Sequence, residues 1–352
     1  MSRVLNYAKA IHEALELALR QDKRVICYGL GVDDPKGIFG TTLGLQQEFG
    51  PERVFDMPTS ENAMTGVAIG AALNGIRPIM THQRLDFSLL AMDQLVNNAA
   101  KWHYMFGGQH SVPVTIRLIL GRGWGQGPTH SQNLQAWFAH VPGLKVVMPT
   151  FPDDAKGLLL SSVFDDNPVV FLEHRWLHSV EGIVPEGDYR IPFGKARRLV
   201  EGDDLTIVSM SYMTVEALHA VEHMASADVS CDLIDLRTIQ PLDWETVFDS
   251  VRRTGRLLVL DTASAFGSVA SEIVGRVSME CFASLKQSPV RLAMPDFPTP
   301  TSPALSAGYY KRAEDIVEIV GRILGKDLKA DVLRRSRTTP HDVPGEWFKG
   351  PF

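Results

Sequence analysis

A glutamate at the start of an apolar helical segment is the residue whose position most suggests chemistry. Glu61 follows Pro58-Thr-Ser60, and residues 62–74 behind it are mostly small or apolar. Ser60 is a suitable N-cap for a helix that begins there. A carboxyl group with so little around it to solvate its charge can share a proton with a nitrogen of a bound ligand. The alternative is an ordinary first-turn glutamate that complements the helix dipole.

A histidine farther along the chain is suited to moving protons. His130 lies three residues after a glycine-rich run, residues 121–127, whose GxGxGxG spacing differs from the GxGxxG of dinucleotide sites. Because imidazole titrates near neutral pH, a histidine in a loop can act as a proton carrier. The alternative is a histidine that only makes structural hydrogen bonds. We interpret the glycine run as a mobile loop that carries His130.

The pattern of apolar residues indicates which elements must position these side chains. Helix-like and strand-like segments alternate through the first half of the chain and again after residue 205. This alternation is typical of parallel sheets with helices on both faces, so we predict an α/β fold with two doubly wound domains. The predicted helices cover residues 5–20, 62–74, 87–105, 153–165, 214–225, 243–253 and 267–281. The predicted strands cover residues 24–29, 78–80, 112–120, 145–148, 168–173, 205–210, 229–236, 256–260 and 290–292.

One stretch without periodicity divides the chain. Residues 176–194 contain two prolines and three glycines, and neither a helical nor a strand pattern continues through them. We therefore predict a first domain over residues 1–180 and a smaller second domain over residues 195–328. Residues 329–352 are predicted to form an extended tail.

Composition places the chain among ordinary globular proteins and excludes several classes. Its 352 residues are 45% apolar and 22% charged, with a net charge of -6. The negative charge and the lack of a basic run argue against nucleic-acid binding. No apolar run is long enough to span a membrane, and the N-terminus lacks a signal sequence. The three cysteines lie far apart, which fits a reducing cytoplasm.

Many motifs occur in an order that identifies a family resemblance. The chain resembles, from about residue 3 to about residue 325, the β subunit of thiamine-diphosphate-dependent 2-oxo acid dehydrogenases, the E1 component of the pyruvate and branched-chain complexes. The resemblance implies a pyrimidine-binding domain of the transketolase type followed by a transketolase-type C-terminal domain. Matching segments include residues 60–61, 70–78, 93–101, 130–132, 142–146 and 235–243.

The resemblance also implies roles for three residues. In that family the glutamate at the position of Glu61 hydrogen-bonds N1′ of the cofactor's aminopyrimidine ring and sets its tautomer. An aromatic residue at the position of Phe87 stacks on the same ring, although a lone phenylalanine is more often part of a core. The histidine at the position of His130 lines the active site and assists acyl transfer. We expect Glu61 and His130 to be catalytic, and Glu61 and Phe87 to bind thiamine diphosphate.

The chain lacks the other half of such a site. No Gly-Asp-Gly followed by an Asn-Asn pair occurs, and in this cofactor class that motif holds Mg²⁺ and the diphosphate. The resemblance therefore implies an α subunit that carries Mg²⁺ and completes the site, in an α2β2 assembly. A lipoyl-bearing acyltransferase is the expected acyl acceptor. The alternatives are a split transketolase-like or acyloin-forming enzyme of a carbohydrate pathway with a non-lipoyl acceptor, and a degenerate structural partner.

One loop matches a position where relatives hold a structural potassium ion. Asp165 and Asn167 would supply ligands, and Ser162 would supply its backbone carbonyl. The alternative is the turn that ends a helix, without an ion.

Departures from the family pattern concern the substrate. Relatives carry two acids at the positions of Leu30 and Gly31, and an acid in the segment that here contains His82 and Arg84. Arginine is a planar donor suited to a carboxylate or phosphate. We therefore predict that His82 and Arg84 contact a more polar or anionic substrate or acceptor. The alternative is that Arg84 forms an ion pair with the α subunit.

Overall fold

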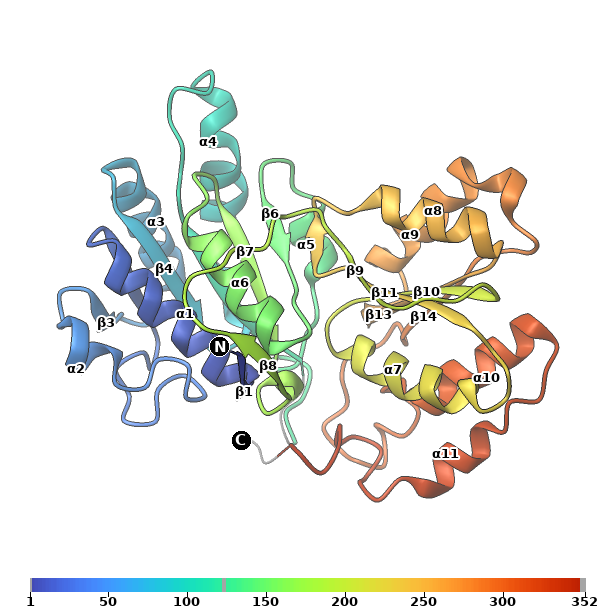
Figure 1. The fold of residues 1–352 in the computed structure, drawn as a ribbon. Coiled ribbons are helices and arrows are strands. Elements are labelled where there is room, and N and C mark those ends of the chain that lie inside the picture. The colour runs from blue at the N-terminus through green and yellow to red at the C-terminus, as the bar shows by residue number, and fades with distance from the viewer. Residues whose placement is uncertain (1, 122–124, 349–352) are drawn as a thin grey trace.

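Two α/β domains lie side by side in the computed structural model of the chain, which describes residues 2–121 and 125–348 (Figure 1). The first domain has a seven-stranded sheet and the second a five-stranded sheet. This architecture confirms the predicted fold class. Residues 122–124 of the glycine-rich run lie outside the described part of the chain, and so does the end of the tail from residue 349.

The first sheet has the order β12-β6-β7-β5-β4-β2-β3, and every pairing from β6 to β3 is parallel. β5 and β7 are buried along their whole length, as expected for strands covered on both faces. Its strands are β2 (Val25–Gly29), β3 (Val54–Asp56), β4 (Arg77–His82), β5 (Thr115–Leu120), β6 (Lys145–Val147), β7 (Val169–His174) and β12 (Thr238–Gln240).

Helices cover both faces of this sheet. α1 (Tyr7–Gln21) and α6 (Pro152–Val163) pack together on one face, where Ile11, Leu15 and Leu158 are fully buried. α3 (Glu61–Leu73) packs on the other face with the helical segment around residue 95. Short helices α2 (Leu45–Phe49), α5 (Gln135–Ala139) and η3 (Arg175–Leu177) lie in the connections.

The second sheet has the order β14-β13-β10-β11-β9, with only β9 antiparallel to its neighbour among the described strands. α7 and α10 pack on one face and α8 and α9 on the other (Figure 1). Its strands are β9 (Arg197–Val200), β10 (Leu205–Ser209), β11 (Cys231–Asp235), β13 (Leu257–Ser264) and β14 (Val290–Met294). Its helices are α7 (Tyr212–Ala225), α8 (Trp244–Thr254), α9 (Val269–Glu280), η4 (Phe282–Ser284) and α10 (Ala313–Leu324).

Two antiparallel pairings join distant parts of the chain. β12, which follows the second domain's β11, pairs with β6 at the edge of the first sheet. β1 (Ser2–Asn6) pairs with β8 (Glu181–Pro185), inside the stretch where the sequence shows no periodicity. Neither β8 nor β12 was predicted, because each is short and its partner lies far away in sequence.

The predicted helix over residues 87–105 is divided into three segments. They are the 3₁₀ helix η1 (Leu85–Ala91), the π-helix η2 (Gln94–Ala99) and the α-helix α4 (Ala100–Met105). π-Helical turns are rare and often occur at functional sites. Phe87 lies within η1, and the π-helix begins seven residues after it, at Gln94.

The prediction of an extended tail over residues 329–352 is wrong in part. Ala330–Ser336 form a helix, α11, which packs against α10. Arg334 pairs with Asp331 one turn earlier and with Glu318 on α10, which holds the turn in place. Beyond α11 the chain returns to the first domain, where Phe348 is buried in the apolar cluster around α1 and α6.

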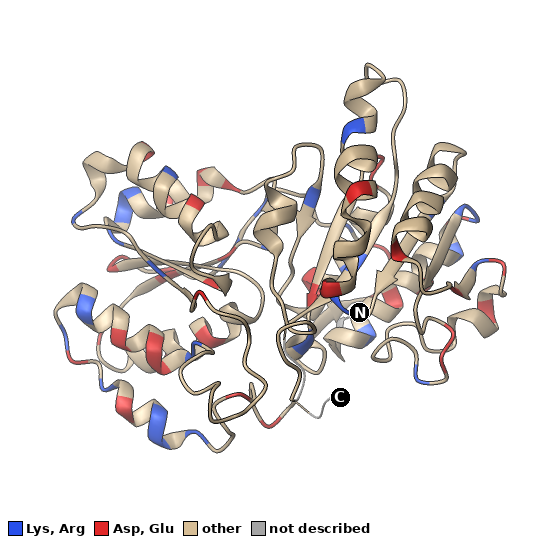
Figure 2. Ribbon diagram, turned by 180° about the vertical axis from the view of Figure 1, so that it is seen from behind, with Lys and Arg blue, Asp and Glu red and all other residues tan. Residues whose placement is uncertain are grey.

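Charged residues of both signs are interspersed along the helices of both domains (Figure 2). Within the described ranges, no helix is both long and apolar enough to cross a membrane.

Candidate active site at the carboxyl ends of the parallel strands

The chemically interesting residues gather where four parallel strands end. β2, β4, β5 and β7 run in the same direction, and their registers place His82 beside Leu118 and Leu120 beside His174. The segments that leave this edge carry Gly31, Arg84, His130 and Arg175. In parallel α/β sheets, ligands bind outside the carboxyl ends of the strands.

Glu61 is the first residue of α3, as its sequence position indicates, and only 5% of its surface is exposed. Ser60 occupies the N-cap position, but its side chain makes no capping hydrogen bond. Thr65 Oγ donates to the Glu61 carbonyl at 2.8 Å. Within residues 2–121 and 125–348, no side chain hydrogen-bonds the Glu61 carboxylate. The residue is therefore largely buried, while its carboxylate oxygens can accept a hydrogen bond from a ligand.

Phe87 and His130 lie next to each other although they are distant in sequence. Their ring centroids are 5.3 Å apart and the planes are nearly perpendicular, at 87°. Thr129 Oγ lies 2.9 Å from His130 Nδ1, so Nε2 is the ring nitrogen that Thr129 does not engage. The His130 amide donates to the Gly127 carbonyl at 3.2 Å, so the loop backbone is also held. The structure thus brings two of the predicted residues together.

Asp86 joins the Phe87 segment to the His130 loop. Its Oδ1 accepts a hydrogen bond of 2.7 Å from the side chain of Gln132, and the residue is largely buried. Sequence reasoning missed this role. The signal in the sequence is that Asp86 adjoins Phe87 and that Gln132 lies two residues after His130. A hydrogen bond between Asp86 and Gln132 therefore holds the segments that carry the two rings.

A fully buried ion pair lies between the ends of β5 and β7. Arg117 donates to Glu173 through Nε at 2.6 Å and Nη2 at 3.0 Å, and also contacts Thr41 and Thr81. Burial alone would raise the pKa of Glu173, but Arg117 holds it below its ordinary value. The pKa of Arg117 is correspondingly raised, since Glu173 outweighs its burial. Each charge therefore compensates the other.

A second pair of buried arginines has no such compensation. Arg84 and Arg175 both lie over the ring of Phe39, with guanidinium carbons 5.4 Å and 5.0 Å from its centroid. Burial lowers the pKa of Arg175 to about 9, and the charge of Arg84 contributes. Burial likewise lowers the pKa of Arg84. Asp86 opposes both shifts as the nearby carboxylate.

His82 is neutral at this edge. It ends β4, is 2% exposed, and burial lowers its pKa to about 4. Its Nε2 has no hydrogen-bond partner within the described part of the chain. His174, which ends β7, has its pKa lowered to about 3, chiefly by burial and then by Arg175. His82 can therefore accept or donate one hydrogen bond at neutral pH but carries no charge there.

The departures after β2 have a local structural reason. Gly31 adopts a φ of +77°, and a Cβ added there would lie 2.3 Å from Nε2 of Gln83. The Gln83 side chain thus occupies the space that a larger residue at position 31 would need. Residue 31 and the segment carrying His82 and Arg84 are consequently packed against each other.

The predicted potassium loop is held by protein cations. Lys145 Nζ contacts the Asp165 carboxylate at 2.5 Å, and Arg77 donates to the Asp165 carbonyl at 2.9 Å. The Ser162 carbonyl accepts from the Asp165 amide at 3.3 Å, and the Asn167 amide donates to Asp165 Oδ1 at 2.8 Å. These bonds supply the positive charge that an ion would supply, and potassium binding here stays a prediction.

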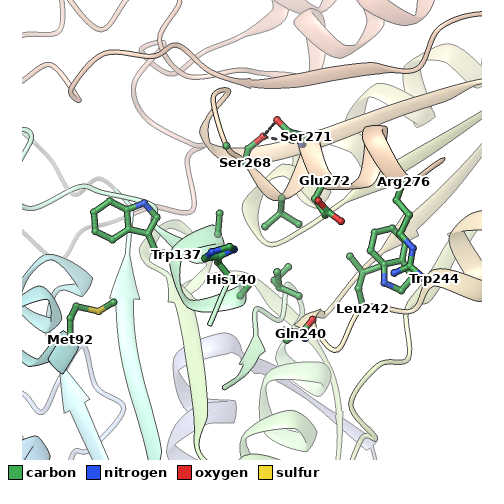
Figure 3. A pocket seen from close by; sticks show the side chains of 15 residues that line it. Met92, Trp137, His140, Gln240, Leu242, Trp244, Ser268, Ser271, Glu272 and Arg276 are labelled. Carbon is green, nitrogen blue, oxygen red and sulfur yellow. Dashed lines mark hydrogen bonds between the residues drawn. The ribbon is translucent and has the colours of Figure 1, made fainter. Parts of the chain in front are cut away.

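A separate cavity of about 800 Å³ opens between the two domains. Figure 3 shows His140 of the first domain on the side toward Ser268, which caps α9, and Glu272 of α9, with Trp137 beyond His140 and with Trp244 and Arg276 together at the other end. The Arg276 guanidinium lies 4.2 Å above the Trp244 ring. None of the residues predicted for catalysis or cofactor binding lines this cavity.

Family models match both halves of the chain. The pyrimidine-binding domain of transketolase matches residues 3–179, and the transketolase C-terminal domain matches residues 194–316. A solved structure described as a split-gene transketolase, an inactive beta4 tetramer, superposes with a TM-score of 0.74 at 24% identity, covering 91% of this chain and 99% of that one. That likeness concerns the fold alone.

Three curated proteins match nearly their whole length. The acetoin:2,6-dichlorophenolindophenol oxidoreductase subunit beta of Cupriavidus necator is 42% identical, covering 90% of this chain and 96% of that protein. The 2-oxoisovalerate dehydrogenase subunit beta of Bacillus subtilis is 39% identical, with 92% and 99% covered. The pyruvate dehydrogenase E1 component subunit beta of Rickettsia conorii is 39% identical, with 90% and 97% covered. The chain therefore belongs to the transketolase-like family of two-domain β subunits that includes these oxidoreductase and dehydrogenase subunits.

Proposed function

We propose that this chain is the β subunit of a thiamine-diphosphate-dependent enzyme of the E1 type. The enzyme decarboxylates a 2-oxo acid and transfers the acyl group to a lipoyl acceptor, and it is active only with an α subunit. Membership in the family of dehydrogenase β subunits supports the reaction class. The observation that carries the assignment to a site is the Phe87–His130 ring contact at the carboxyl edge of the sheet.

The residues present fit the pyrimidine half of thiamine diphosphate. An aminopyrimidine needs a carboxyl group at one ring nitrogen and an apolar surface against its face. Glu61 offers a carboxylate on a largely buried residue, and Phe87 offers a ring from the segment that packs against α3. The diphosphate and Mg²⁺ need a different set of ligands, which we assign to the α subunit.

The cofactor, when bound, supplies a carbon nucleophile that attacks a 2-oxo group. The chain's own residues bind, orient and exchange protons. Glu61 would share a proton with a ring nitrogen of the bound pyrimidine, and Phe87 would pack against that ring and exclude water. His130, with Nδ1 engaged by Thr129, has Nε2 for proton exchange during acyl transfer. Asp86 and Gln132 keep the two rings in contact.

An exposed apolar ridge supports an obligate partner. Tyr104 and Met105 of α4 and Phe106 just beyond it follow one another in sequence and are all exposed, and Tyr104 is 88% exposed. Figure 1 shows α4 projecting from the first domain. Contiguous exposed apolar groups on a folded protein indicate an interaction surface. We assign this ridge to subunit assembly in an α2β2 complex, because half-sites require a partner and oligomers favour closed symmetry.

Reconstitution with the α subunit tests the proposal. The chain is purified alone and with its α subunit, and each preparation is assayed with pyruvate, 2-oxoisovalerate and acetoin as donors. We expect CO₂ release from a 2-oxo acid by the complex only, and acylation of an added lipoyl domain. Turnover of acetoin alone, or transfer only to an aldehyde, would instead favour an acyloin-cleaving or transketolase-like enzyme.

Failure to bind the cofactor has a separate meaning. If the assembled complex does not bind thiamine diphosphate in a calorimetric titration with Mg²⁺, the chain is a structural partner and the proposed function fails.

A further inference from the structure

Arg84 and Arg175 form a buried pair of guanidinium groups on one aromatic ring. Arg175 is fully buried and Arg84 is 9% exposed, and both lie within 5.4 Å of the Phe39 ring centroid. Phe39 has a φ of +52°, a conformation that a bulky residue adopts only when its surroundings hold it there. The three side chains come from separate parts of the sequence, and the fold brings them together at the sheet edge.

The charges around the pair do not balance. Asp86 is the carboxylate that acts on both arginines, and its Oδ1 is already bonded to Gln132. The Glu173 carboxylate is bonded to Arg117 and cannot serve the pair. His82 and His174 are uncharged at neutral pH, because burial lowers both pKa values far below 7. Among the described residues, two positive charges therefore face one negative charge.

Several donors of the pair also lack acceptors. Nε of Arg84 and both Nε and Nη2 of Arg175 are buried without a hydrogen-bond partner among the residues that the structure describes. Arg84 Nη1 donates to the Gln83 carbonyl at 2.6 Å and Arg175 Nη1 to the Gln126 side chain at 2.5 Å. Burying charged donors without acceptors lowers the stability of the folded protein, and such groups are retained mainly at functional sites.

We propose that Arg84 and Arg175 form a subsite for an oxyanion, a carboxylate or a phosphate, that the donor substrate retains through the reaction. Their free N–H groups make the planar, bidentate contacts that such anions accept. The assignment to the donor rests on the proposed function. The anion is not the carboxyl group that leaves as CO₂, because strong pairing of that group would stabilise the ground state more than the transition state.

The first test measures anion binding without catalysis. The αβ complex is heated in rising concentrations of malonate or inorganic phosphate, with ionic strength held constant by NaCl. We expect a saturable rise in the melting temperature, because an anion bound only by the folded state stabilises it. Arg84→Met and Arg175→Met should abolish the rise, while Arg322→Met, an exposed arginine on α10, should leave it intact.

Conservative variants distinguish a loss of anion binding from a failure to fold. Arg84→Lys and Arg175→Lys keep the charge but remove the planar fork, so each should fold and bind the probe about 10-fold or more weakly. Wild-type protein that shows no saturable response to either anion would overturn the proposal. So would a loss of subunit assembly in Arg84→Lys with unchanged probe affinity, which would place Arg84 in the α interface.

The second test uses the reaction. kcat/KM is compared for 2-oxobutanoate, 2-oxoglutarate and a 2-oxo acid ending in phosphate, which distinguishes a carboxylate from a phosphate ligand. We expect the wild type to prefer one anionic donor, and Arg175→Lys to raise KM for that donor with little effect on 2-oxobutanoate. Equal losses for all donors would contradict the subsite. If no 2-oxo acid reacts at all, the proposed function fails, and the melting experiment still decides the subsite.

Discussion

Arg117 and Arg175 are equally buried at one edge of one sheet, yet only Arg117 is hydrogen-bonded to a carboxylate. Arg117 is held by both oxygens of Glu173, and the pair is enclosed by threonine hydroxyls. Arg175 shares a phenylalanine ring with Arg84 and leaves two nitrogens without acceptors. Glu173 and Arg175 are separated by a single residue: Glu173 lies in β7, and Arg175 begins η3 directly after that strand.

The difference separates stability from ligand recognition. A compensated pair is already satisfied and gains nothing from a ligand, so its role is to fix β5 against β7. An uncompensated pair lowers the stability of the free protein and gains most when an anion arrives. We therefore expect changes at Arg117 and Glu173 to act on folding, and changes in the second region to act on binding and activity.

The largest expected effect is on folding. Glu173→Gln leaves the Arg117 guanidinium buried without its countercharge and should destabilise the protein by about 3–5 kcal/mol. Urea unfolding followed by circular dichroism measures this. The double variant Arg117→Met with Glu173→Met removes both charges and should recover much of the loss. Arg175→Met should cost little or be stabilising, and an equally large loss there would abolish the distinction between the two regions.

The next effect is on catalysis without loss of folding. Glu61→Gln keeps the shape of the side chain but weakens its hold on a proton, so cofactor activation should slow by about 10²–10⁴-fold. Hydrogen–deuterium exchange at C2 of thiamine diphosphate in the αβ complex measures this step directly. Exchange at the wild-type rate, with a normal melting temperature, would remove Glu61 from its proposed role.

Acid should destabilise the sheet edge that carries His82. The pKa of His82 is about 4 in the folded protein, below the ordinary 6.5, so the unfolded chain binds more protons between these values. Stability contributed by neutral His82 is therefore present above pH 6.5 and is lost as the pH falls toward 4, by about 2 kcal/mol at pH 5. His82→Leu should reduce the fall in melting temperature between pH 7.5 and pH 5. An unchanged pH profile would show that other groups cause it.

Local patterns in the sequence were sufficient for the elements that carry the site. Glu61 begins α3 because a run of small apolar residues follows a turn, and β4, β5 and β7 are buried apolar runs. The roles of Phe87 and His130 came from the family resemblance, since a lone phenylalanine or histidine has no distinctive local pattern. Their contact in the structure agrees with that expectation but does not test their chemistry.

The sequence could not reveal partners that only the fold brings together. Arg117 and Glu173 are 56 residues apart, and Asp86 and Gln132 are 46 apart. Arg175 follows a strand and has no motif around it, so its proximity to Arg84 depends on the strand order β7-β5-β4. For the same reason β12 was missed, because its short sequence becomes a strand only at the edge provided by β6.

The smallest expected effect concerns a third ionic group, whose contribution to stability can be compared with that of the buried Arg117–Glu173 pair. Lys145 and Asp165 form a partly exposed pair, with side chains 32% and 16% exposed, so water already screens both charges. Lys145→Met should therefore destabilise the protein by only about 0.2–1 kcal/mol.

Melting in KCl and in NaCl at equal concentration tests the potassium prediction at the same site. A rise specific to KCl in the variant, absent in the wild type, would show that Lys145 takes the place of the ion. A rise in both proteins would show that the ion binds beside Lys145, because the remaining carbonyl oxygens would then suffice as ligands.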